Sequence, residues 1–246
     1  MEVIPAIDII GGKCVRLRQG DFNAAHVYDD DPVVAAKKFE TAGLRRLHVV
    51  DLDGAKAGHP INLRIIEQIA RQTDLILDVG GGLKSGANYS DIFNAGAAMA
   101  TVGTLAATNR ELTCALLRQW GPTRLILGAD SRDGFVSVSG WRETTALSTI
   151  DYVCNYLCEG FTTVICTDIA KDGMLQGPSL ELYEMMIAKA SSYGLKINLI
   201  ASGGVASIED LDRLNTIGCS GAIIGKALHD NLVDAASLAQ WENKQC

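Results

Sequence analysis

Residues 75–85 read LILDVGGGLKS, and residues 197–207 read INLIASGGVAS. Each stretch is a short apolar run followed by at least two glycines, which is typical of a buried parallel strand that ends in a tight turn. The glycine pairs Gly81-Gly82 and Gly203-Gly204 lie 122 residues apart in a chain of 246 residues. This spacing indicates that the second half of the sequence repeats the first.

Further pairs of residues keep the same spacing. Asp8 and Asp130 each end an apolar run, and Gly103 and Gly225 each follow one, again 122 residues apart. Glycines after strands are often no more than turn residues, but several residue pairs with the same spacing of 122 are hard to explain by chance. We therefore expect two half-barrels, at about residues 1–122 and 123–246, within a single domain that spans residues 1–246.

Apolar runs rich in strand-forming residues alternate with amphipathic stretches along the whole chain. The expected strands are Val3–Ile9, Leu47–Leu52, Leu75–Val79, Ala98–Val102, Arg124–Ala129, Thr163–Thr167, Ile197–Ala201 and Gly221–Ile224. The expected helices are Pro32–Ala42, Ile61–Arg71, Ala87–Asn94, Asn109–Trp120, Thr149–Glu159, Leu180–Ser191, Ile208–Leu214 and Leu232–Trp241. Eight such units in this length of chain predict an α/β fold, a single (β/α)8 TIM barrel.

Composition and charge exclude several classes of protein. Hydrophobic residues make up 48% of the chain, no apolar run is long enough for a membrane span, and Glu2 and Asp8 interrupt the apolar N-terminus. The net charge of −7 argues against nucleic acid as a partner, because a phosphate backbone needs a basic face. We expect a cytoplasmic protein, a monomer, without a membrane or nucleic-acid partner.

The sequence also gives no sign of a metal or cofactor. The seven cysteines form no CxxC pair and the four histidines have no ligand spacing. The glycine-rich stretches match neither the P-loop nor the GxGxxG pattern of nucleotide sites. We expect reduced thiols, no metal and no cofactor.

The glycine-containing segments predict two phosphate sites. Barrel enzymes work at the carboxyl ends of their strands, and the loops after strands seven and eight commonly hold a phosphate there. Here those loops supply Ser202, Gly203, Gly204, Gly225 and Lys226. The equivalent residues of the first half are Gly81, Gly82, Gly103 and Thr104. A small substrate with a phosphate at each end fits two such sites, although one half could keep only a structural vestige of its site.

Asp8 and Asp130 are the candidate catalytic residues. They end strands one and five, which lie on opposite sides of an eight-stranded barrel. A single aspartate at a strand end often only stabilises a loop, but a matched pair suits a general base and a general acid that act on one substrate. A proton shift along a sugar phosphate needs this division and no cofactor.

Several loop residues have two interpretations each. Arg16 and Arg18 can neutralise a phosphate or remain solvated, and Trp141 can stack on a substrate ring or pack its own loop. Asp51 and Asp168, each near the end of a strand, can face a substrate or tie their loops together by hydrogen bonds.

Taken together, the motifs resemble a family of histidine biosynthesis, the phosphoribosylformimino-aminoimidazole carboxamide ribotide isomerases. The matching stretches are IPAIDIIGGKCVRLRQGD (Ile4–Asp21), VVDLDGAKAG (Val49–Gly58), DVGGGL (Asp78–Leu83), TDIAKDGMLQGP (Thr167–Pro178), ASGGV (Ala201–Val205) and GAIIGKAL (Gly221–Leu228). The resemblance implies an Amadori rearrangement of an aminoaldose to an aminoketose. It implies Asp8 as proton acceptor, Asp130 as proton donor, and supporting roles for Thr167 and Asp172. With these roles, we expect Asp130 to have a raised pKa and Asp8 to stay ionised.

The sequence departs from the family pattern at two places and leaves alternatives open. Lys84 stands where the family often has arginine, and Ser179 where it often has asparagine. The cyclase subunit of imidazole glycerol phosphate synthase shares the repeat and both aspartates, but its first strand reads differently from residues 5–9. Phosphoribosylanthranilate remains possible as a second substrate. The third alternative is a phosphate-binding barrel without catalytic activity.

Overall fold

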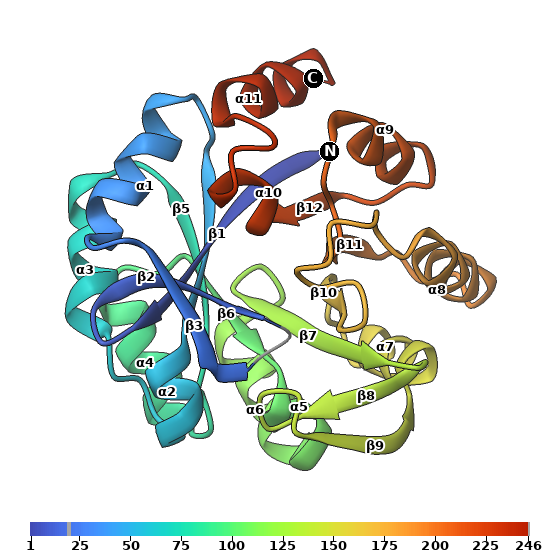
Figure 1. Cartoon of the computed structure of the whole chain (residues 1–246). Helices are drawn as coiled ribbons and strands as arrows, with labels where there is room; N and C mark the ends of the chain where they lie inside the picture. The colour runs from blue at the N-terminus through green and yellow to red at the C-terminus, as the bar shows by residue number, and fades with distance from the viewer. Residues whose placement is uncertain (19–20, 246) are drawn as a thin grey trace.

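The computed structural model describes residues 1–18 and 21–245, and within these a closed barrel of eight parallel strands forms the centre (Figure 1). The strands are β1 (Glu2–Ile10), β4 (Arg46–Asp51), β5 (Ile76–Gly80), β6 (Met99–Val102), β7 (Leu125–Arg132), β10 (Thr163–Asp168), β11 (Asn198–Ser202) and β12 (Gly221–Ile224). They pair in this order, and β12 pairs again with β1 to close the barrel. The expected TIM barrel is thereby confirmed.

Helices form the outer layer of the barrel (Figure 1). The helices that pack on its outside are α1 (Pro32–Thr41), α3 (Leu63–Gln72), α4 (Gly86–Asn94), α6 (Arg110–Trp120), α7 (Thr149–Cys158), α8 (Leu180–Ser192), α9 (Ile208–Thr216) and α11 (Ala235–Lys244). Each corresponds to an expected helix. Short helices α2 (Leu52–Ala57), α5 (Thr104–Thr108) and α10 (Lys226–His229) precede three of them. None of the helices in the described ranges has the length and apolarity that crossing a membrane requires.

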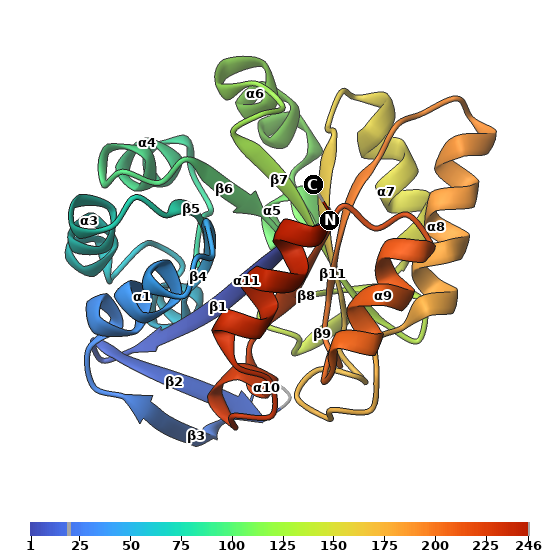
Figure 2. The same ribbon diagram turned by 90° about the horizontal axis from the view of Figure 1, so that it is seen from above.

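Two antiparallel hairpins extend the barrel, and the sequence did not predict them. The first, β2 (Lys13–Arg18) and β3 (Asp21–Asp29), pairs with the end of β1, and Figure 2 shows it beside β1 and α10. The second, β8 (Phe135–Val138) and β9 (Glu143–Ser148), pairs with the end of β7. Because β1 and β7 carry the two candidate aspartates, both hairpins stand at the mouth of the barrel.

The interior of the barrel has an apolar side and a charged side. Ile4, Ile126, Ile165, Ile200 and Ile223 form one buried cluster, supplied by β1, β7, β10, β11 and β12. On β4 and β5 the place of apolar residues is taken by Arg46 and Asp78, which are buried and joined by an ion pair of 2.8 Å. Burying charges is unfavourable unless they are paired, so this side of the barrel is built around that pair.

Candidate active site

A cavity of about 360 Å³ opens at the carboxyl ends of the barrel strands. Most of the residues that the sequence singled out for catalysis or binding line it: Asp8, Arg16, Gly81, Gly82, Gly103, Thr104, Asp130, Trp141, Thr167, Asp172, Ser202, Gly203, Gly204, Gly225 and Lys226. Asp51 and Asp168 are not among the lining residues. The size and mixed lining of the cavity are typical of a site for a small molecule. The side chain of Arg18 lies outside what the structure describes.

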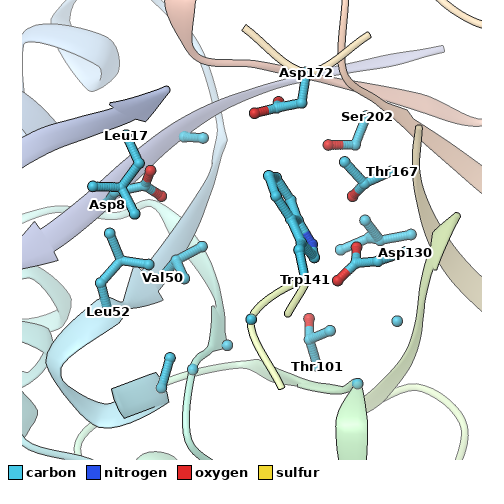
Figure 3. A pocket seen from close by; sticks show the side chains of 18 of the residues that line it. Asp8, Leu17, Val50, Leu52, Thr101, Asp130, Trp141, Thr167, Asp172 and Ser202 are labelled. Atoms are coloured by element: carbon cyan, nitrogen blue, oxygen red, sulfur yellow. The ribbon is translucent and has the colours of Figure 1, made fainter. Parts of the chain in front are cut away.

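Asp8 and Asp130 lie on opposite sides of this cavity, and the ring of Trp141 lies between them in Figure 3. Both residues are half-buried as a whole. Burial, and secondarily the charge of Asp172, raises the pKa of Asp8 to about 7, against a smaller opposing effect of His48. This differs from the expectation of an ionised Asp8, since the barrel wall withdraws the carboxylate from water and the charge of Asp172 adds to the effect of burial.

The pKa of Asp130 is raised as well, as expected. Burial is the largest cause, and hydrogen bonds from Trp141 and Thr167 lower the pKa in opposition to it. Thr167 on β10 stands directly opposite Asp130 in the register of β7 and β10, so the sheet itself fixes this contact. Both candidate catalytic groups therefore have raised pKa values, with different neighbours.

Asp172 is the third carboxyl group of the cavity. Burial and the charge of Asp130 raise its pKa to about 6, while Arg16 and Lys226 act in the opposite direction. Arg16 donates to Asp230 over 2.8 Å, and Lys226 donates to the backbone oxygen of Gly173 over 2.7 Å. Arg16 and Lys226 are thus held beside the cavity by contacts with the chain.

The glycine pairs after β5 and β11 are required by close packing of the backbone. A Cβ atom on Gly82 would lie 2.1 Å from the backbone oxygen of Gly54, and one on Gly204 would lie 2.3 Å from that of Gly177. Both residues have positive φ, of 74° and 85°. The helices that follow these pairs, α4 and α9, begin a few residues later, and their amino ends are capped by Ser85 and Ser207.

Gly103 and Gly225 differ from these pairs in a way that bears on anion binding. Each is the N-cap residue of a short helix, α5 or α10, and makes no side-chain capping hydrogen bond. A Cβ on Gly103 would meet no atom within 4 Å, and one on Gly225 only the side chain of Ala6 at 3.9 Å. Unpaired N–H groups at a helix amino end with open space before them favour an anion.

Trp141 lies in the turn of the β8–β9 hairpin. The three successive residues Ser139, Gly140 and Trp141 all have positive φ, at 59°, 66° and 66°. The N–H of Ser139 donates to the hydroxyl of Thr104 over 2.9 Å, which joins this turn to the amino end of α5. For a bulky residue such a backbone is strained, and strain of this kind clusters at functional sites.

The remaining aspartates of the strand ends tie loops together. Asp51 is fully buried and accepts hydrogen bonds from the N–H groups of Gly54, Ile61 and Asn62 at 2.7–2.9 Å. Asp168 accepts from the N–H of Ala170 and from the hydroxyl of Ser179. Of the two interpretations offered by the sequence, the structure favours the loop-stabilising one, and Ser179 supplies one of these contacts.

His48 lines the cavity and was missed by the sequence reasoning. It lies on β4, and its Nδ1 contacts the buried carboxylate of Asp78 on β5. Burial would lower the pKa of His48, but the Asp78 carboxylate beside it more than compensates, so the pKa is raised. The sequence shows a polar histidine within the apolar run of β4, which could have indicated a functional residue. The sequence analysis considered the histidines only as metal ligands. Among the described residues, no group of His, Cys, Asp or Glu is arranged to hold a metal ion.

Comparison with known proteins gives one consistent result. The family model described as histidine biosynthesis protein matches residues 2–234. Relatives from Parabacteroides distasonis and Bacteroides thetaiotaomicron are each 46% identical, over 98% and 97% of this chain and 99% and 98% of their own lengths. A relative from Flavobacterium johnsoniae is 45% identical over 99% of this chain and 98% of its own. Each is named an imidazole-4-carboxamide isomerase, and the full name contains two phosphoribosyl groups.

Proposed function

The chain belongs to the histidine biosynthesis protein family and is an isomerase of that pathway, and we propose that it rearranges phosphoribosylformimino-5-aminoimidazole carboxamide ribotide from an aminoaldose to an aminoketose. The observation that carries this proposal is the pair Asp8 and Asp130 on opposite sides of one cavity. Such a pair can exchange protons with two ends of the same reacting group. The names of the relatives, with two phosphoribosyl groups, support the choice of substrate.

The two phosphates would bind at the amino ends of the short helices. The first turns after Gly103 and Gly225 have no side-chain cap and begin at residues that line the cavity, so their backbone N–H groups are available to an anion there. Lys84 and Lys226 line the cavity and add positive charge near the two sites. An acidic protein can hold a doubly charged substrate in this way, because the binding groups are local and the net charge is spread over the whole surface.

In the proposed reaction, Asp130 donates a proton to the ring oxygen of the aminoaldose ribose. The ring C1–O bond then breaks, and the electrons of the amino nitrogen form the C=N bond of a Schiff base. Asp8 removes the proton from C2, and the electron pair of that C–H bond gives the enolamine. Return of this proton from Asp8 to C1, with transfer of the C2 hydroxyl proton to Asp130, gives the aminoketose and restores both carboxyl groups. Thr167, opposite Asp130 in the sheet, would hold the donor in position, and Asp172 would complete the polar wall.

The protonation states support this assignment. A raised pKa favours the protonated form of Asp130, which a proton donor needs. Asp8, with a pKa of about 7, is ionised in about half of the molecules at neutral pH, and a base of this kind accepts a proton more readily than an ordinary carboxylate. Trp141, strained and close to Asp130, would stack on the imidazole ring of the substrate.

The test compares wild type with Asp8→Asn and Asp130→Asn in turnover of the ribotide and in binding of the product. We expect both substitutions to lower kcat by at least about a hundredfold and to leave the dissociation constant of the product within a few fold. Asp91→Asn, at an exposed position of α4, is the matched control and should change neither. A wild-type protein that binds the ribotide but never converts it would instead be a binding barrel.

A further inference from the structure

A chain of charged groups crosses the floor of the barrel below Asp8. Glu2 on β1 pairs with Arg46 on β4 at 2.9 Å, and Arg46 pairs through its Nε with Asp78 on β5 at 2.8 Å. Asp78 in turn contacts Nδ1 of His48 on β4. His48 lines the cavity, whereas Arg46 and Asp78 do not, so the imidazole is the end of this chain that reaches the reacting groups.

The register of the strands brings His48 close to Asp8. His48 is opposite Ala6 on β1, and Asp8 is the next residue of β1 on the same face of the strand. His48 is also opposite Asp78 on β5, so β4 places it between the strand that carries the carboxylate in contact with it and the strand that carries Asp8. The rest of the barrel floor is the apolar isoleucine cluster, which does not screen these charges.

We propose that Asp78 and Arg46 hold His48 as a cationic positioning residue whose charge favours the ionised, proton-accepting form of Asp8. The inference rests on the proposed role of Asp8 as the base and adds what keeps that base ionised in a buried place. Without a nearby cation, burial and the neighbouring Asp172 would leave Asp8 protonated over more of the neutral range. Asp78 is the group that keeps the imidazole protonated, because burial alone would discharge it.

The groups that face His48 and Asp8 come from several elements, and their effects have opposite signs. Arg46 lowers the pKa of His48, while Asp78 and Asp8 raise it. For Asp8, Asp172 from the loop after β10 acts against His48. The charge of the same imidazole also lowers the pKa of Asp130 on β7, so it acts in the same direction on both candidate catalytic groups. The net effect on Asp8 therefore depends on whether His48 carries its proton.

A purely structural interpretation makes a different prediction. If Asp78 served only to neutralise Arg46 in the interior, His48 could be neutral and its loss would alter stability or kcat without moving a pH profile. The two interpretations predict different protonation states of His48 and different positions of the acid limb in the pH profile of kcat/KM. Both readouts are available in the full-length protein.

The first measurement is an NMR titration of the histidine rings in the wild-type protein, with the His48 signal assigned by its absence in His48→Gln. We expect His48 to remain protonated at a pH where a solvent-exposed imidazole has lost its proton. In Asp78→Asn, the same signal should move to the neutral form at lower pH. This readout does not depend on substrate, so it stands even if the ribotide is not converted.

The second measurement is the pH dependence of kcat/KM for the ribotide. His48→Gln and Asp78→Asn should each move the acid limb upward by about one pH unit. Adding Asp78→Asn to His48→Gln should give no further shift, because both act through one charge. Glu2→Gln, which removes the other partner of Arg46, is the control and should leave the limb unchanged.

Two results would overturn the inference. One is a His48 ring that is neutral in the wild type at pH 6; the other is an acid limb that stays in place in His48→Gln. If Asp78→Asn does not fold, the wild-type titration and His48→Gln decide the question by themselves. Absence of ribotide turnover with a cationic, Asp78-dependent His48 would refute the proposed substrate and leave the electrostatic assignment standing.

Discussion

Asp8 is a carboxyl group that folding places in unfavourable surroundings. Burial raises its pKa from 3.8 to about 7, so above neutral pH the folded protein holds a charge that the unfolded chain would keep in water. The stability of the folded state associated with this group is fully present below pH 3.8 and is lost as the pH rises through 7. A group of this kind trades stability for function.

Asp8→Asn is therefore expected to stabilise the protein at high pH. At pH 8 the free energy of unfolding should rise by up to about 4 kcal/mol over wild type, and the difference should vanish toward pH 4, where both side chains are neutral in the folded protein. Urea unfolding at a series of pH values measures this. Asp91→Asn should show no such pH dependence, and equal stability of Asp8→Asn and wild type at pH 8 would contradict the raised pKa.

The same group predicts the acid limb of catalysis. Because Asp8 must be ionised to accept a proton, kcat/KM should fall about tenfold for each pH unit below about 7, the pKa of Asp8. Steady-state kinetics between pH 5 and 9 gives the profile. A profile that is flat down to pH 5 would mean that Asp8 is not the base whose ionisation limits the reaction.

At the scale of residues, the sequence predicted the aspartates and their place but not their surroundings. Asp8 and Asp130 could be found because they repeat at a fixed spacing at strand ends. His48 could not, because its role depends on Asp78, which is distant in sequence and becomes a neighbour only through the pairing of β4 and β5. Register between parallel strands is not visible in a single sequence.

At the scale of elements, the loop after β10 packs on the glycines after β11. The N–H of Gly177 donates to the backbone oxygen of Gly204 over 3.1 Å, and Gly204 leaves no space for a side chain. This contact places the 168–179 segment, which carries Asp172, at the edge of the cavity. We expect the position of this segment to depend on the glycine more than on any side chain.

Gly204→Ala should accordingly displace that segment. The clash of the new Cβ with the oxygen of Gly177, together with the positive φ, predicts a loss of more than about 2 kcal/mol of stability and weaker binding of product. Gly86→Ala, at the start of α4, where a Cβ would meet no atom within 4 Å, is the matched control. Thermal unfolding and product titration check both; a Gly204→Ala variant as stable as wild type would contradict the packing argument.

The sequence predicted the eight strands and eight outer helices within a few residues, because each has a strong apolar pattern. It did not predict the β2–β3 and β8–β9 hairpins or the short helices α2, α5 and α10. The β9 residues 143–148 are mostly exposed and carry no clear alternation, and a helix of four residues such as α10 leaves no periodic signal. The elements that shape the mouth of the barrel are those with the weakest patterns.

At the scale of the whole molecule, closure of the barrel brings together residues from its entire length. Asp8, Asp130 and Asp172 are far apart in the chain but line one cavity, and the β12–β1 pairing joins the two ends of the fold. Both β1 and β7 continue into an antiparallel hairpin, and both α5 and α10 start at an uncapped glycine. The division into half-barrels at residues 1–122 and 123–246 stays a prediction that these correspondences favour.

The measurement that tests the central claim most directly is turnover of the bisphosphorylated aminoimidazole carboxamide ribotide by the purified wild-type protein in the presence of EDTA. The account predicts conversion to the aminoketose at an undiminished rate when EDTA is added, since the assigned steps use only Asp8 and Asp130. No conversion by a protein shown to be folded, while phosphoribosylanthranilate is rearranged under the same conditions, would contradict the assigned substrate. Loss of conversion on addition of EDTA would contradict the acid–base mechanism.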